Sequence, residues 1–196
     1  MKPFVLGLTG GIAGGKSLAA DIMREYGAYS IDADIVSRAV TAPGTVGARA
    51  IAAAFPAAVS DGGIDRRRLK EIVFSDRAAL AQLNGITHPL IRAELERRIE
   101  ACDRPAVVLV VPLLFETGMN DLCDKTVTVS CAESERIKRM IRRDTVSEEL
   151  ARAVLGSQLT DAEREKKADF VLHNDGDMAS FRREVLSFCN RILPRA

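Results

Sequence analysis

The chain has 196 residues, of which 47% are hydrophobic and 28% charged, and its formal net charge is +1. This composition excludes a disordered chain, and the balanced charge argues against a nucleic-acid or anionic-membrane binder. No apolar run approaches the roughly 18 to 20 residues of a membrane span. We therefore expect one cytoplasmic α/β domain that binds neither nucleic acid nor membrane.

The first predicted elements are a strand, a loop and a helix. Residues 4–8 form an apolar run without alternation, which predicts a strand buried on both faces. A helical pattern follows over residues 17–26 and Gly27 closes it. The intervening loop fits G-x-x-x-x-G-K-[ST], whose backbone N–H groups and helix N-terminus suit a phosphate. It comprises Gly10, Gly11, Ile12, Ala13, Gly14, Gly15, Lys16 and Ser17.

Two side chains of this loop have predicted roles. We expect Lys16 to reach the β- and γ-phosphates of ATP, and the Ser17 hydroxyl to bind Mg²⁺. The alternative is a glycine-rich turn that carries Lys-Ser by coincidence, and the flanking strand and helix argue against it. ATPases, GTPases and kinases share the motif, so the loop does not identify the acceptor.

Two carboxylates follow the next predicted strand, residues 29–31. A spacing of two places Asp32 and Asp34 on the same side of an extended chain, at a strand end that borders the ligand crevice of an open α/β sheet. Phosphoryl transfer to an alcohol needs a carboxylate that accepts the proton of the hydroxyl. Asp34 is our candidate base and a helix N-cap is its alternative role. Asp32 could shape the pocket or bind Mg²⁺ through water.

Residues 43–103 have a helical sequence and no predicted strand, which indicates a helical insertion. Within it, His88 precedes Pro89. The plain interpretation is the first turn of a helix with Pro near N1, and the alternative is a role in substrate positioning. The second buried strand, residues 106–111, leads to Leu114, a candidate apolar wall, and Glu116, a candidate ribose ligand. A loop that only covers the core is the alternative for these two.

A third predicted strand covers residues 126–129, and residues 133–167 then form a second helical insertion. Its first helix carries five cations in eight residues, and most fall opposite a narrow apolar stripe, facing solvent or a ligand. A solvated helix face is the alternative, but beside a phosphate loop we expect a lid in which Arg139 and Arg143 clamp the phosphates. A strand over residues 169–172 and a helix over residues 180–193 complete the chain. The five cations are Arg136, Lys138, Arg139, Arg142 and Arg143.

Together these motifs resemble the dephospho-coenzyme A kinase family over nearly the whole chain. The resemblance implies transfer of the ATP γ-phosphoryl group to the ribose 3′-hydroxyl of dephospho-coenzyme A, giving coenzyme A and ADP. It also implies that Thr9 and Glu116 lie beside the acceptor, Asn174 near the nucleotide base, and Asp34 at the base position. The matching segments are residues 7–12, 15–17, 31–34, 88–89, 111–116, 142–144 and 168–174.

The resemblance further implies a P-loop fold with a five-stranded parallel sheet flanked by helices, a helical substrate domain and a helical lid. We expect the core over about 1–42, 104–132 and 168–196, the substrate insertion over 43–103 and the lid over 133–167. We expect ATP and Mg²⁺ as co-substrate and cofactor, and a monomer or weak homo-oligomer. A nucleoside kinase and a nucleotide-dependent switch are the competing functions, and no Asn-Lys-x-Asp guanine motif supports the latter.

Overall fold

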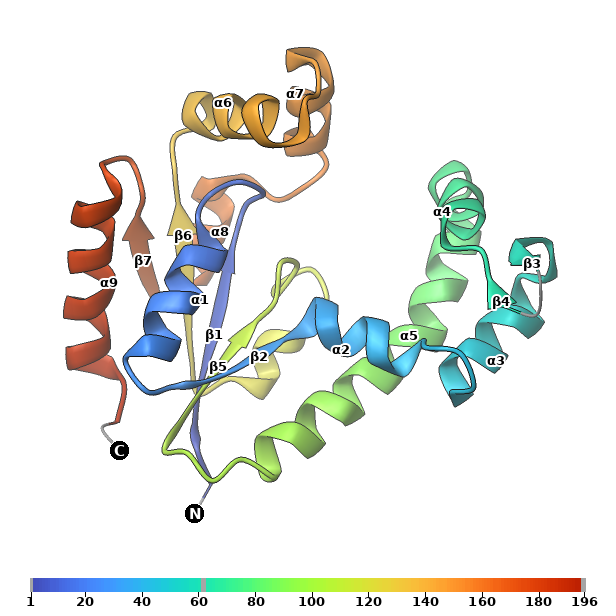
Figure 1. Ribbon diagram of the computed structural model, residues 1–196, viewed down its shortest axis with the longest axis horizontal. Helices are drawn as coiled ribbons and strands as arrows, with labels where there is room; N and C mark the ends of the chain where they lie inside the picture. The colour runs from blue at the N-terminus through green and yellow to red at the C-terminus, as the bar shows by residue number, and fades with distance from the viewer. Residues whose placement is uncertain (1, 61–62, 195–196) are drawn as a thin grey trace. The chain divides into compact units, whose positions relative to one another are not determined.

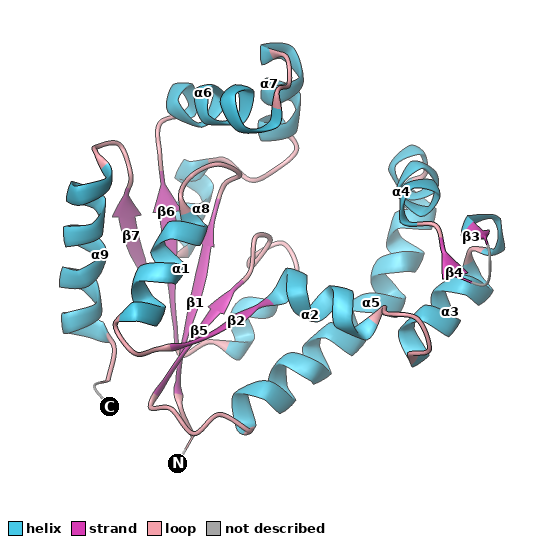
Figure 2. Ribbon diagram, in the orientation of Figure 1, coloured by secondary structure: helices cyan, strands magenta, loops and turns pink. Residues whose placement is uncertain are grey.

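The structure is a computed structural model that describes residues 2–60 and 63–194 (Figure 1, Figure 2). The chain packs as two compact units. The first comprises Met1–Asp32 and Ile99–Ala196, and the second comprises Ala33–Arg98. Sequence placed the start of the insertion at Pro43, whereas the second unit begins ten residues earlier along the chain, at Ala33.

The first unit is built on a five-stranded sheet, and all of its pairings are parallel. The strand order β2-β5-β1-β6-β7 puts β1 in the middle, with Leu6 paired to Val108 of β5 and to Lys125 of β6. The predicted five-stranded parallel sheet is therefore confirmed. The strands are β1 (Phe4–Gly10), β2 (Tyr29–Asp32), β5 (Ala106–Val110), β6 (Lys125–Ser130) and β7 (Phe170–His173).

The strand order creates a switch point at the carboxyl end of β1. After β1 the chain continues to β2 and later β5 on one side of it, and finally to β6 and β7 on the other. Ligands of open α/β sheets bind where the order reverses in this way. Helices α1 (Lys16–Glu25) and α9 (Met178–Ile192) pack on the sheet, and their apolar faces share one buried cluster with it.

The rest of the first unit includes the helical segment over residues 133–167. Its helices are α6 (Glu133–Asp144), α7 (Glu148–Gly156) and α8 (Asp161–Lys167), and α8 contacts β6. A small cluster of Ile137, Met140, Ala151 and Leu155 joins α6 to α7. A short 3₁₀ helix, η2 (Met119–Leu122), precedes β6.

The second unit is mainly helical but contains a small hairpin that the sequence analysis missed. Strands β3 (Val59–Ser60) and β4 (Gly63–Ile64) pair antiparallel. Two-residue strands are too short to display an alternating pattern, so the prediction of no strand between 43 and 104 is wrong. The helices are α2 (Ala33–Val40), α3 (Val46–Ala54), η1 (Pro56–Ala58), α4 (Arg66–Ser75) and α5 (Arg77–Glu100).

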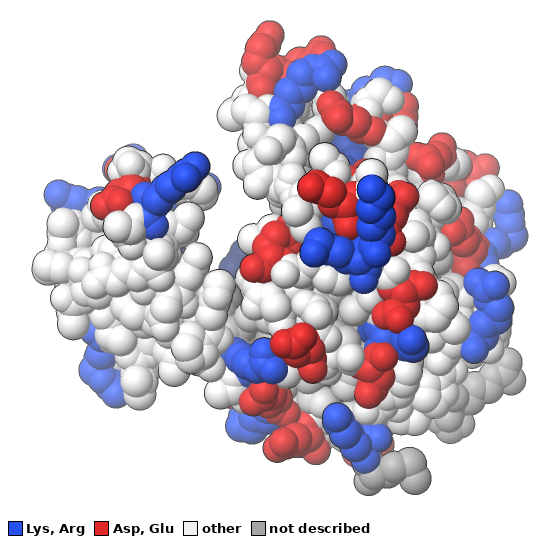
Figure 3. All heavy atoms as spheres, turned by 180° about the vertical axis from the view of Figure 1, so that it is seen from behind, with Lys and Arg blue, Asp and Glu red and all other residues white. Residues whose placement is uncertain are grey.

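The surface is mixed in charge, and no helix of the described residues is suited to span a membrane. Acidic and basic side chains are interspersed over the face shown in Figure 3. Within residues 2–60 and 63–194, no helix combines the length and the apolar sequence that crossing a bilayer requires.

Candidate functional site

The phosphate loop connects the central strand to α1. Strand β1 ends at Gly10 and α1 begins at Lys16, with Gly15 as its N-cap at φ 106°. A Cβ on Gly15 would collide with the side-chain amide of Asn174. The Gly14 N–H donates to the Gly11 carbonyl over 3.0 Å, which folds the loop back on itself. The α1 N-terminus, whose first N–H groups have no intrahelical partner, therefore opens toward the switch point.

Ala13 takes the left-handed conformation in this loop, with φ 59°. That region is uncommon for a residue with a Cβ. The Ala13 side chain packs with Ile12 against the apolar cluster that joins α6 to α7. The apex of the phosphate loop is thus attached to the helical segment that follows β6.

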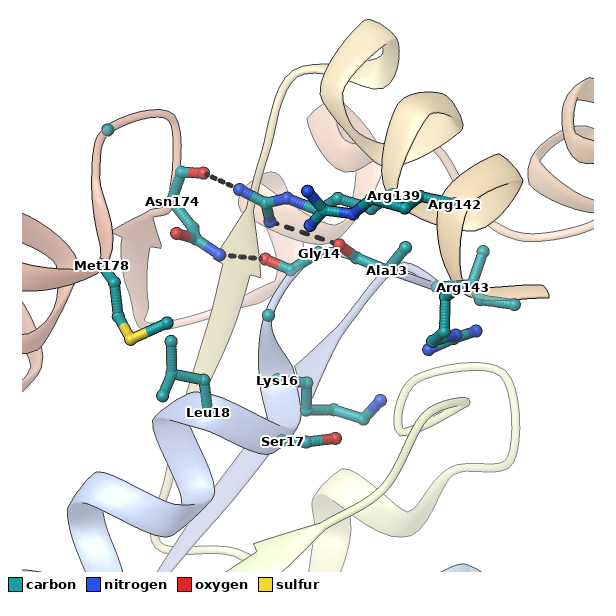
Figure 4. Close-up of a pocket in the computed structure, with 14 residues that line it drawn as sticks. Ala13, Gly14, Lys16, Ser17, Leu18, Arg139, Arg142, Arg143, Asn174 and Met178 are labelled. Atoms are coloured by element: carbon teal, nitrogen blue, oxygen red, sulfur yellow. Dashed lines mark hydrogen bonds between the residues drawn. The ribbon is translucent and has the colours of Figure 1, made fainter. Parts of the chain in front are cut away.

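Asn174 and Arg139 hold two further carbonyl groups of the loop (Figure 4). The Asn174 side-chain amide donates to the Gly14 carbonyl over 2.8 Å, and Asn174 is only 5% exposed. Arg139 donates to the carbonyls of Ala13 and Asn174, over 3.3 and 3.2 Å. In this structure, therefore, Asn174 supports the loop, and Arg139 links the loop to the end of β7.

A pocket of about 740 Å³ lies over the loop. This size falls in the range of roughly 300–1,000 Å³ that is typical of ligand pockets. Among its described lining residues there are four cations and no carboxylate, so the pocket favours an anion. The lining comprises residues 11–18, Arg139, Arg142, Arg143, Asn174, Gly176 and Met178.

The structure separates the α6 arginines that the sequence grouped together. Arg142 also lines the pocket. The sequence pattern could not separate Arg142 from its neighbouring arginines. Arg143 forms a bidentate pair with Asp144 at 2.7 and 2.8 Å, and this pair raises the pKa of Arg143 and lowers that of Asp144. Arg136 is the exception to the expectation that most of these cations face solvent or a ligand, because it is only 5% exposed.

Leu18 and Met178 form an apolar part of the pocket that the sequence analysis did not single out. Their side chains face each other beside Asn174 in Figure 4, from the first turn of α1 and the start of α9. An apolar slot next to a phosphate site suits the flat ring of a nucleotide base. No sequence signal marks Met178 for this place, because it belongs to no motif.

The residues here fit Mg²⁺ only with help from the nucleotide. Ser17 is exposed and lines the pocket, so its hydroxyl is available as an oxygen ligand. In the part of the chain that the structure describes, no group of three or more His, Cys, Asp or Glu side chains forms a cation cage. Mg²⁺ commonly retains waters and binds through phosphate oxygens with one or two protein ligands. The donor set is compatible with that mode of binding.

Four predicted acceptor residues belong to the first unit. Thr9 is fully buried, and its hydroxyl donates to the Pro112 carbonyl over 3.1 Å. Asp32 ends β2, beside Val110 of β5. Glu116 is exposed. Leu114 is fully buried and lies against Gly7, which favours a packing role over contact with the acceptor.

The remaining two, Asp34 and His88, belong to the second unit. Asp34 is exposed in the first turn of α2, which begins at Ala33, so it lies inside the helix rather than at an N-cap. His88 is half-buried in the middle of α5. The interpretation of His88-Pro89 as a helix start is therefore wrong: the helix extends on both sides of Pro89, which removes only one backbone donor.

Comparisons of the sequence and of the structure with known proteins point to the same family. A family profile described as "Dephospho-CoA kinase" matches residues 4–180. The chain belongs to the dephospho-CoA kinase family. A dephospho-CoA kinase of Aromatoleum aromaticum is 43% identical over 185 residues, covering 93% of this chain and 90% of the relative. The solved structure "Dephospho-CoA kinase from Campylobacter jejuni" is 32% identical with a TM-score of 0.73, and 96% of each chain is covered.

More distant structures share the fold of the dephospho-CoA kinase family. A shikimate kinase from Bacteroides thetaiotaomicron superposes with a TM-score of 0.52 at 15% identity, covering 96% of this chain and 98% of that one. The likeness concerns the fold alone. The family assignment decides between the competing functions, since it places the chain among kinases that act on dephospho-CoA rather than among nucleotide-dependent switches.

Proposed function

We propose that this chain transfers the γ-phosphoryl group of ATP to the ribose 3′-hydroxyl of dephospho-coenzyme A, giving coenzyme A and ADP. The observation that carries the proposal is a cationic pocket over a P-loop, in a chain that matches the dephospho-CoA kinase family over residues 4–180. The competing nucleoside-kinase activity has no comparable support.

The proposed division of work on the nucleotide side follows from the pocket lining. Lys16 contacts the β- and γ-phosphates, and the backbone N–H groups at the start of α1 bind the β-phosphate. Arg139 and Arg143, the predicted pair, line the pocket together with Arg142 and neutralise charge that develops on the transferred group. Leu18 and Met178 hold the base. The Ser17 hydroxyl would hold Mg²⁺, and the bound cation would supply positive charge that offsets that of the phosphates.

On the acceptor side, Asp34 orients the 3′-hydroxyl and accepts its proton as the new P–O bond forms. Asp32, Glu116, Thr9 and His88 contribute to acceptor binding. The second unit, residues 33–98, would act as the substrate-binding part, in place of the 43–103 expected from the sequence, and residues 133–167 would act as the expected lid. The expectations of a cytoplasmic location and of a monomer or weak homo-oligomer stay predictions.

The test is a reaction of the purified full chain with ATP and Mg²⁺, with and without dephospho-coenzyme A. ADP release is followed by a coupled assay, and the acceptor by mass spectrometry. A product heavier by one phosphoryl group, formed only when ATP is present, supports the proposal. Folded protein that binds ATP but gives no phosphorylated acceptor would contradict it and direct the search to other alcohols.

A further inference from the structure

Two polar side chains bond to the phosphate loop from outside the pocket, and two more support one of them. They come from α6, the α7–α8 connection and α8, and are Arg136, Gln158, Asp161 and Arg164. Among the residues that the structure describes, none of these four lines the pocket over the loop. They therefore act on the loop without touching the proposed position of the nucleotide.

Two of them bind both main-chain polar groups of Ile12. The Arg136 Nε donates to the Ile12 carbonyl over 3.0 Å, and the Gln158 Oε1 accepts from the Ile12 N–H over 3.1 Å. With the bonds from Arg139 to Ala13 and from Asn174 to Gly14, three consecutive loop carbonyls are each held by a side chain.

Holding a carbonyl also directs the neighbouring N–H group. A trans peptide is planar, so its C=O and N–H point in opposite directions. The bonds to the carbonyls of Ile12 and Gly14 consequently turn the N–H groups of Ala13 and Gly15 away from the side chains that hold them. Backbone N–H groups are what a P-loop offers to phosphates.

Arg136 belongs to a triad in which the half-buried Asp161 joins two buried arginines. Asp161 accepts from Arg136 over 2.7 Å and from Arg164 over 2.6 Å. Arg136 is 5% exposed and Arg164 1%, so two cations share one carboxylate and a positive charge remains beside the loop. The Arg164 Nε is buried without a hydrogen-bond partner among the described residues. Gly11 permits this arrangement, because a Cβ there would collide with both guanidinium groups.

We propose that Gln158 and the triad of Arg136, Asp161 and Arg164 are positioning residues that set the orientation of the two peptides flanking Ile12: Gln158 holds the Gly11–Ile12 peptide and Arg136 the Ile12–Ala13 peptide. Through these peptides they align the phosphate-binding N–H groups, so that affinity for a triphosphate depends on the α7–α8 connection. The apolar packing of Ile12 against the α6–α7 cluster acts in the same direction. This inference rests on the proposed function only in taking ATP as the ligand.

Gln158→Ala provides the first test, because Gln158 is only half-buried and its loss leaves the core intact. We expect the Kd for ATP, measured by calorimetry on the full chain, to rise about fivefold, the effect of one net hydrogen bond. The Kd for adenosine, which lacks phosphates, should stay unchanged, as should the KM for dephospho-coenzyme A. Arg152→Ala, an exposed arginine of α7 paired with Glu148, is the matched control and should match wild type.

The outcomes separate the two proposals. If wild type binds ATP and Gln158→Ala binds it equally well, the positioning role is overturned. The same holds if the affinities for adenosine and ATP fall together, since that pattern reports a general loss of structure. Failure of the wild type to bind ATP at all would instead refute the proposed function.

Asp161→Asn tests the triad, with Glu163→Ala as its control. Both substitutions alter the first turn of α8, but the hydrogen bonds that the structure gives Glu163 all go to Thr160 of the capping box rather than to the triad. We expect Asp161→Asn to weaken ATP binding at least as much as Gln158→Ala, and Glu163→Ala to leave it unchanged. An equal loss in both variants would attribute the effect to the helix start and contradict the triad. If Asp161→Asn does not fold, the Gln158→Ala result decides.

Discussion

The phosphate loop and the proposed acceptor residues are supported by the chain in different ways. The loop lies within one unit, where buried side chains of α6 and of Asn174, just after β7, hold its backbone. Arg164 of α8 supports the α6 arginine through Asp161. The two acceptor carboxylates lie on either side of a boundary, because Asp32 ends one unit and Asp34 belongs to the next. Nucleotide binding should therefore depend on one unit, whereas acceptor use depends on both. Mutations can test whether the two properties are separable.

The largest effect is expected for Lys16→Ala, which removes the phosphate-binding cation of the loop. Transfer should fall by about 10³, the scale of a lost electrostatic contact to the transition state, and the Kd for ATP should rise as well. Steady-state kinetics and calorimetry measure the two effects. Arg24→Ala, which alters an exposed arginine at the other end of α1, is the control. An unchanged ATP affinity in Lys16→Ala would contradict the proposed phosphate site.

Asp34→Ala should damage only the acceptor side. We expect kcat to fall by about 10² and the Kd for ATP to change less than about twofold, as for the loss of a general base. Asp34→Glu keeps a negative charge in the first turn of α2 but moves the carboxylate. If Glu restores kcat fully, the role of Asp34 is helix stabilisation. If it does not, the base assignment stands.

A pH experiment tests how much Asp169, the residue just before β7, contributes to the stability of the first unit. The hydrogen bond from Lys125, together with those from Thr126, holds the pKa of the Asp169 carboxyl below its ordinary value. A depressed pKa stabilises the fold above the unfolded pKa of about 4, and this contribution is lost as the pH falls through the folded pKa. Asp169→Asn should lower the unfolding free energy by about 1 kcal/mol at pH 7.

Urea titrations of wild type and Asp169→Asn at several pH values measure this difference. It should shrink as the pH falls below about 4, because protonation then abolishes the same interactions in wild type. A difference that stays constant down to low pH would show that the carboxylate charge does not matter. Because Asn174 directly follows β7, the Kd for ATP of Asp169→Asn shows whether the substitution also disturbs the end of this strand.

The smallest effect on ATP binding is expected for Thr45→Ala in the second unit. Thr45 caps α3 by accepting from the Ala48 N–H over 3.1 Å. Loss of such a cap costs about 1 kcal/mol. The unfolding free energy should fall by that amount, while the Kd for ATP stays unchanged. A parallel fall in ATP affinity would show that the two units are coupled, and the proposed separation would then fail.

The features that could be predicted are those encoded in local sequence. Unbroken apolar runs predicted β1 and β5, and the glycine-lysine motif predicted the loop between β1 and α1. The hairpin of β3 and β4 was not predicted because two-residue strands are too short to show a periodic pattern. Asp61-Gly62 between them is a hairpin-turn sequence and was the available signal; both residues lie outside those described.

The contacts that hold the loop could not be predicted. Gln158 and Ile12 are 146 residues apart, and one sequence contains no signal that pairs them. Helical periodicity grouped Arg136 with Arg139, although burial and a carboxylate partner separate them in the fold. Such pairings arise from tertiary packing, which a pattern within one helix cannot report.

The left-handed Ala13 at the apex of the loop has a consequence for binding entropy. Glycine would adopt this φ without strain, whereas alanine incurs about 1–2 kcal/mol. Alanine also samples fewer conformations than glycine, and its methyl group is held against the α6–α7 cluster. The loop therefore has less disorder to lose when a phosphate enters it. Part of the affinity for ATP would then arise because the loop has already lost conformational entropy on folding, and not from an additional contact with the ligand.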